Sequence, residues 1–102
     1  MQVQILPVPQ IKFNIMSWNY RLMAQPDGSG GIWFEIHEVY YNEEGKPESY
    51  TTNPTDVSGN DINDIIFTLN KMRKVLNTPT LWMGDKFPEE FDYDKWIKNK
   101  KL

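Results

Sequence analysis

Alternation of apolar and polar side chains predicts three β-strands in the first half of the chain. The predicted strands cover residues 18–23, 32–41 and 48–52. A glycine-rich loop at residues 25–31 separates the first two strands. A hairpin turn at residues 42–46, with Gly45 in the left-handed conformation, joins the second strand to the third. We therefore expect a three-stranded antiparallel meander.

The two faces of the second predicted strand differ in character. The more apolar face, which we expect to point into the core, consists of Ile32, Phe34, Ile36, Glu38 and Tyr40. The opposite face consists of Trp33, Glu35, His37, Val39 and Tyr41. The chain contains four Trp, five Tyr and five Phe, which is more than one helix over a three-stranded sheet can easily enclose. Two interpretations of the opposite face are open. The N-terminal arm and the C-terminal tail of the same chain could cover it, or it could form an interface, since exposed Trp and Tyr concentrate binding energy. On the second interpretation it is our candidate partner-binding surface.

Helical periodicity replaces the strand pattern after residue 60. Apolar side chains recur at the spacing of a single helical stripe, at Ile62, Ile65, Ile66, Leu69, Met72 and Leu76. Ser58 or Asn60 is expected to cap the helix N-terminus, and Pro79 marks its end. Because neither the stripe nor the sheet can bury its apolar side alone, we expect this helix to lie across the sheet.

The two ends of the chain carry weaker signals. Residues 81–83 fit either a short strand or an apolar contact, and residues 88–91 or 92–98 predict a short terminal helix. Residues 1–15 contain two prolines and fit an N-terminal arm or an added edge strand. The predicted fold is α+β: a three- to four-stranded antiparallel sheet, one long amphipathic helix packed on it and a short C-terminal helix. Residues 16–102 would form this single domain.

Composition narrows the possible chemistry. Lys and Arg number 11 against 14 Asp and Glu, so nucleic acid is not an expected partner. The chain has no cysteine and one histidine, which excludes disulfides, thiolate nucleophiles and Cys- or His-rich metal sites. No apolar run approaches the ~20 residues that cross a bilayer, and residues 1–15 lack signal-peptide features. We expect a cytoplasmic protein without cofactor, metal or membrane contact.

The only catalytic-looking group is the histidine with its neighbouring carboxylate. Glu35 and His37 point to the same side of a strand, an arrangement that could serve a general base or a ligand site. A histidine beside a glutamate on a sheet is more often a structural hydrogen-bonding pair. We therefore predict no catalytic residues, and keep a small-molecule-binding or hydrolytic module as an alternative.

Two motifs resemble those of a family of small bacterial and phage proteins. They are the WNYR sequence at residues 18–21 and the IHEVYYNEEGKP sequence at residues 36–47. The resemblance extends over residues 16–81 and implies neither an activity nor catalytic residues. Members tend to begin near the position of Met16, which supports treating residues 1–15 as an addition. Three strands followed by one helix are also similar in shape to HicB-type antitoxins.

These observations lead to a functional hypothesis. The sequence has more aromatic side chains than the predicted core can enclose, and it has no recognisable set of catalytic residues. These two features predict a non-catalytic protein-interaction module. Its partner would be another protein or a second copy in a homodimer, bound through Trp33, Glu35, His37, Val39 and Tyr41. In a phage, as the resemblance permits, the module would block a host factor. An antitoxin-like partner of a toxin is the other interaction hypothesis.

Overall fold

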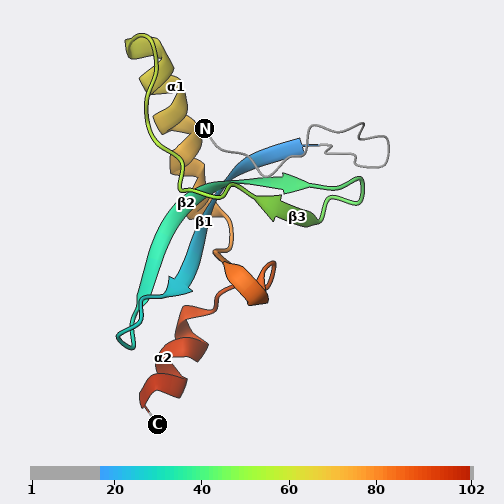
Figure 1. Cartoon of the computed structure of the whole chain (residues 1–102), viewed down its shortest axis with the longest axis vertical. Helices are drawn as coiled ribbons and strands as arrows, with labels where there is room; N and C mark the ends of the chain where they lie inside the picture. The colour runs from blue at the N-terminus through green and yellow to red at the C-terminus, as the bar shows by residue number, and fades with distance from the viewer. Residues whose placement is uncertain (1–16, 102) are drawn as a thin grey trace.

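The computed structural model describes residues 17–101, and α+β secondary structure accounts for most of them (Figure 1). The elements are β1 (Ser17–Pro26), β2 (Ile32–Tyr41), β3 (Pro47–Tyr50), α1 (Ile62–Arg73), the 3₁₀ helix η2 (Lys74–Asn77), β4 (Leu81–Trp82), the 3₁₀ helix η3 (Gly84–Lys86) and α2 (Tyr93–Lys101). The predicted arm at residues 1–15 lies outside the described residues. The strands, the long helix and the terminal helix all occur close to their predicted positions.

The sheet has four strands in the order β3-β2-β1-β4. Strands β1, β2 and β3 form the expected antiparallel meander. Gly45 has φ 76° in the hairpin between β2 and β3, as predicted. Strand β4 pairs with β1 in parallel, so that Met23 lies opposite Leu81. The sheet is therefore mixed, and the prediction of a wholly antiparallel sheet is wrong.

The buried centre lies on the face of the sheet that was predicted to be left over. Met23 of β1, Val39 of β2 and Leu81 of β4 form it, each at most 2% exposed. Around it pack the partly buried side chains of Tyr41, Tyr50, Met83 and Phe87. Strand β4 supplies Leu81, and the residues after it cover this face. The C-terminal segment thus covers the face that the sequence analysis left either to a partner or to the two ends of the chain.

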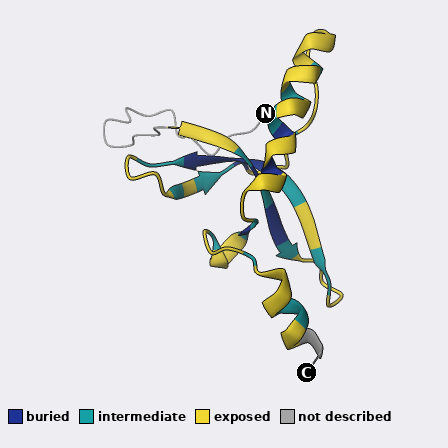
Figure 2. Ribbon diagram, turned by 180° about the vertical axis from the view of Figure 1, so that it is seen from behind, coloured by how far each residue is buried: buried dark blue, intermediate teal, exposed yellow. Residues whose placement is uncertain are grey.

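Helix α1 does not lie across the sheet. It is attached near its C-terminal end, where Met72 and, in η2, Val75 are buried. The rest projects beyond the sheet (Figure 1), and most of it is exposed (Figure 2). The prediction that one helical stripe covers the sheet is therefore wrong for most of its length. This end of α1 and the following 3₁₀ turn make the contacts with β1.

The C-terminal helix α2 is held to the body by aromatic contacts. Phe91 makes edge-to-face contacts with Phe34 of β2 and Trp82 of β4, with ring centroids 5.7 and 5.0 Å apart. It also packs against Trp96 of α2 at 6.3 Å. Such pairs contribute about 0.5–1.5 kcal/mol beyond area burial. This aromatic chain connects the sheet, β4 and α2.

Candidate interaction surface

Helix α1 presents a row of large apolar side chains to solvent. The row starts at Ile62, which is 71% exposed, and ends in η2 at Leu76, which is 74% exposed. Ile66 and Leu69 lie between them, at 49% and 51% exposure. Clusters of exposed aliphatic side chains mark interaction sites, because soluble monomers rarely leave large contiguous apolar patches in water.

The spacing of these side chains is that of a coiled-coil seam. Successive positions are separated alternately by four and three residues, with Arg73 completing the row. This repeat places side chains along one narrow strip of a helix, as at the a and d positions of a heptad. We call Ile62, Ile66, Leu69, Arg73 and Leu76 the outer stripe.

A different row of side chains attaches the helix to the sheet. Met72 is 7% exposed and Val75 is 3% exposed. Thr68, on the same side of the helix, shares a cleft of about 260 Å³ with Tyr20 of β1. At 3.6 residues per turn, this row lies about a third of a turn from the outer stripe. The single predicted stripe therefore splits into an inner row and an outer one.

Capping interactions hold the first turn of α1 without burying its apolar side chains. Oδ1 of Asp61 accepts a hydrogen bond of 3.0 Å from the backbone N–H of Asp64. Oδ2 of Asp64 accepts one of 2.9 Å from the N–H of Asn60. This reciprocal arrangement satisfies backbone donors that have no partner within a helix. The cap is thus Asp61, rather than Ser58 or Asn60 as predicted.

The structure separates the five residues predicted to bind a partner. His37 and Val39 are fully buried under the C-terminal segment, so neither side chain is accessible to another molecule. Glu35 and Tyr41 are partly exposed, and only Trp33, at 57%, is largely exposed. The predicted surface is therefore not continuous. Its centre belongs to the interior of the chain, because β4 adds beside β1 and brings the following residues over it.

The histidine is part of a closed hydrogen-bond network. Nε2 of His37 lies 2.8 Å from Oε1 of Glu35, and Nδ1 lies 3.0 Å from both the carbonyl oxygen and Oγ1 of Thr51. Nε1 of Trp33 donates to Oε2 of Glu35 at 3.0 Å. Nε2 can donate to Glu35, while Nδ1 can donate to the carbonyl oxygen of Thr51 or accept from its hydroxyl, depending on the tautomer. Both ring nitrogens are thus engaged inside the fold, where they tie β2 to the end of β3.

A buried carboxylate lies on the opposite face of β2. Glu38 is 3% exposed, and its Oε1 accepts a hydrogen bond from the hydroxyl of Tyr40. Burial raises the pKa of Tyr40, and the bond to Glu38 and its negative charge raise this pKa further. Burial and the same charge also raise the pKa of Tyr20, which lies opposite Glu38 on β1. This cluster keeps both phenols protonated; it lies beside the attached end of α1.

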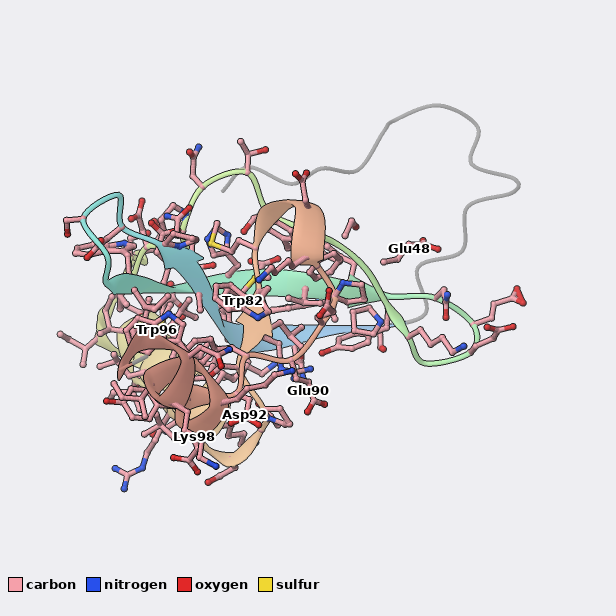
Figure 3. The ribbon with its side chains drawn as sticks, turned by 90° about the horizontal axis from the view of Figure 1, so that it is seen from below. Glu48, Trp82, Glu90, Asp92, Trp96 and Lys98 are labelled. Carbon is pink, nitrogen blue, oxygen red and sulfur yellow. The ribbon has the colours of Figure 1, made fainter. Side chains whose placement is uncertain are left out.

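A second, more polar cleft lies beside α2. It has a volume of about 410 Å³. Its lining residues are Trp82, Lys86, Glu89, Glu90, Asp92, Lys95, Trp96 and Asn99. Trp82 and Trp96 both line it, and Figure 3 shows Trp96 and Lys98 on α2, with Glu48 well apart from them. Three acidic and two basic side chains line this cleft, so it presents no field of one sign that would select a charged ligand.

Within residues 17–101, no group of three or more His, Cys, Asp or Glu side chains is arranged to hold a metal ion. In the same part of the chain, no helix has the length and apolar character needed to cross a membrane. No protein-family model, curated protein or solved structure matches this chain. The outer stripe is therefore the strongest candidate site that the geometry itself provides.

Proposed function

We propose that this chain is a non-catalytic protein-interaction module that binds its partner through the outer stripe of α1. The observation that carries the proposal is four large aliphatic side chains at coiled-coil spacing, each about half exposed or more. Fully burying one such side chain contributes about 1.5–3 kcal/mol. A partner that covers the row gains a large driving force, and a helix is the element that its spacing fits.

The partner types suggested by the sequence keep their place in this proposal. A host factor blocked by a phage protein, or a toxin held by an antitoxin-like protein, would dock on the outer stripe. The aromatic face of β2 is a weaker alternative, because His37 and Val39 at its centre are fully buried. The hydrolytic alternative gains no support either, since both nitrogens of His37 are occupied by Glu35 and Thr51.

A photocrosslinking experiment tests the proposal. A benzophenone amino acid is placed at Ile66, within the outer stripe, and in a matched chain at Phe67. Phe67 is also exposed, at 62%, but lies on another side of the helix. We expect position 66 to give a discrete cross-linked species in cells of the source organism, and position 67 to give none. Equal products from both positions, or none from either, would contradict the proposal.

A purified partner identified in this way allows a quantitative check. We expect Leu69→Glu to weaken binding at least tenfold in calorimetry, because the variant places a charge in the centre of the apolar row. Phe67→Glu introduces the same charge outside the row and is expected to bind like the wild type. Equal losses for the two variants would show that binding does not depend on the outer stripe.

A further inference from the structure

Resting on the proposed function, we propose that the occupant of the outer stripe is α1 of a second copy of this chain, running antiparallel across a two-fold axis. The 16 residues of α1 and η2 give a helix of roughly 24 Å. A two-fold pair places the same surface on both sides of the interface. In an antiparallel pair, the first residues of the row in one copy face the last residues of the same row in the other copy, so these two ends must fit each other.

Three positions of the outer stripe meet this requirement. With Leu69 on the two-fold axis, the central leucines of the two copies face each other. Ile62 then lies opposite Leu76 of the second copy, because each is seven residues from Leu69. Ile66 lies three residues before Leu69 and Arg73 four residues after it, so these two side chains are offset from each other by one residue in the pair. Each copy thus contributes the apolar side chains that cover those of the other.

Charge decides between the antiparallel and the parallel arrangement. Asp61 caps α1 and Asp64 lies in its first turn, whereas its last turn carries Lys71 and Arg73. An antiparallel pair brings the acidic beginning of one helix beside the basic end of the other and opposes the helix dipoles. A parallel pair would instead place Arg73 against its own copy. A single polar side chain in an apolar seam is known to select register and orientation.

Arg73 supplies an independent reason to expect a counter-charge from outside the chain. Within the described residues it forms no ion pair; the two ion pairs there join His37 to Glu35 and Lys46 to Glu44. It is the one charged side chain in an otherwise apolar row and is exposed to solvent. In the antiparallel pair its side chain lies within reach of the acidic first turn of the second copy.

The surroundings of the helix leave room for a second copy. The connection between β3 and α1 runs along the inner side, where Asn53, Pro54 and Thr55 share a cleft with Thr68. At 3.6 residues per turn, Leu69 of the outer stripe lies about 100° around the helix from Thr68, and α1 projects beyond the sheet (Figure 1). Two helices can therefore pair along the stripe while the two sheets remain apart.

Cysteine cross-linking tests both the pairing and its direction, because the chain has no natural cysteine. On oxidation we expect Leu69→Cys to form a covalent dimer and Phe67→Cys to form no cross-link. An equimolar mixture of Ile62→Cys and Leu76→Cys should form a mixed covalent dimer, whereas Ile62→Cys alone should form no covalent dimer. A dimer of Ile62→Cys alone would indicate a parallel pair and overturn the proposed direction.

Light scattering of the full chain supplies the second readout. We expect a mass of twice 12.1 kDa at high concentration, with a dissociation constant at least tenfold higher for Leu69→Glu and unchanged for Phe67→Glu. Circular dichroism confirms that both variants fold. A monomer at all concentrations, without cross-links from Leu69→Cys, overturns the second copy as occupant. The proposed function then still stands if position 66 cross-links a different protein, and fails as well if it cross-links none.

Discussion

The hydroxyl group of Tyr40 donates a hydrogen bond to Glu38, two residues earlier on the same face of β2. Both side chains are almost fully buried, with exposures of 4% and 3%. Within the described residues, Oε2 of Glu38 has no hydrogen-bond partner. The carboxylate therefore depends on Tyr40 for its side-chain hydrogen bond. A buried carboxyl group with a single donor makes this pair sensitive to substitution, and the raised pKa of Tyr40 makes its contribution to stability depend on pH.

We expect Tyr40→Phe to lower the free energy of unfolding at pH 7 by about 1–3 kcal/mol, because the carboxylate loses its donor while remaining buried. The pH dependence follows from the raised pKa of Tyr40. The folded chain retains a proton that the unfolded chain releases near the ordinary pKa of 10.0. The stability contributed by this group is fully present below pH 10 and is lost as the pH rises further.

Urea denaturation between pH 8 and roughly pH 11 measures this effect as a difference between the two proteins, so that groups common to both cancel. The wild type should lose stability more steeply above pH 10 than Tyr40→Phe. The variant keeps part of the slope, because the pKa of Tyr20 is raised in the same direction. Identical slopes for the two proteins would contradict the assignment to Tyr40.

A second prediction concerns the network around His37. Glu35→Ala removes the partner of a fully buried ring nitrogen and the acceptor of Trp33. We expect a loss of about 1–3 kcal/mol in the free energy of unfolding, because an unpaired buried group carries its full desolvation cost. The matched variant Glu48→Ala removes an exposed carboxylate from β3 and should change stability by less than about 0.5 kcal/mol. Equal effects would show that the histidine contact is not structural.

The short-range features of the fold could be predicted because they depend on neighbours in the sequence. Alternating side chains located β1 and β2, and turn chemistry placed Gly45 in the left-handed region. Helical periodicity located α1. Each of these predictions depends on fewer than about twenty consecutive residues. Within such a segment, the repeat of apolar positions matches the repeat of the strand or helix backbone.

The long-range features could not be predicted in the same way. Leu81 pairs with Met23 across more than fifty residues, and no local pattern indicates a parallel partner for β1. This pairing covers His37 and Val39, and so removes the predicted interaction surface from solvent. A single sequence identifies an apolar side chain, but it does not show whether another segment of the same chain or a partner molecule will bury that side chain.

The candidate site was missed for a related reason. Ile62, Ile66, Leu69 and Leu76 were assigned to the same stripe as Met72, on the assumption that every apolar position of the helix faces the sheet. The signal that distinguishes them is the strict alternation of four- and three-residue intervals, interrupted by Arg73. A charged residue at such a position is out of place under a sheet, whereas a helical partner can accommodate it.

A third prediction addresses the hairpin between β2 and β3. Gly45 has φ 76°, and a Cβ atom at this position would meet no other atom within 4 Å. Any cost of substitution is therefore backbone strain rather than a clash. We expect Gly45→Ala to cost about 1–2 kcal/mol, since left-handed backbone carries a penalty of this size for L-residues. Gly45→Asn should cost less, because asparagine tolerates this region. Equal losses of stability for the two variants in thermal unfolding would show that the cost does not come from backbone strain at Gly45.

The last prediction concerns the attachment of α1. Val75 is 3% exposed, and with Met72 it forms the apolar contact that fixes the end of the helix to the sheet. Val75→Ala removes two buried methyl groups, and we expect it to lower the free energy of unfolding by about 2 kcal/mol. Val57, at 41% exposure in the preceding connection, provides the matched control, and Val57→Ala should change stability by less than about 0.5 kcal/mol. Urea denaturation followed by tryptophan fluorescence compares the two. If both substitutions cost the same, the helix is not anchored through its last turn, and the division of α1 into an inner row and an outer stripe loses its support.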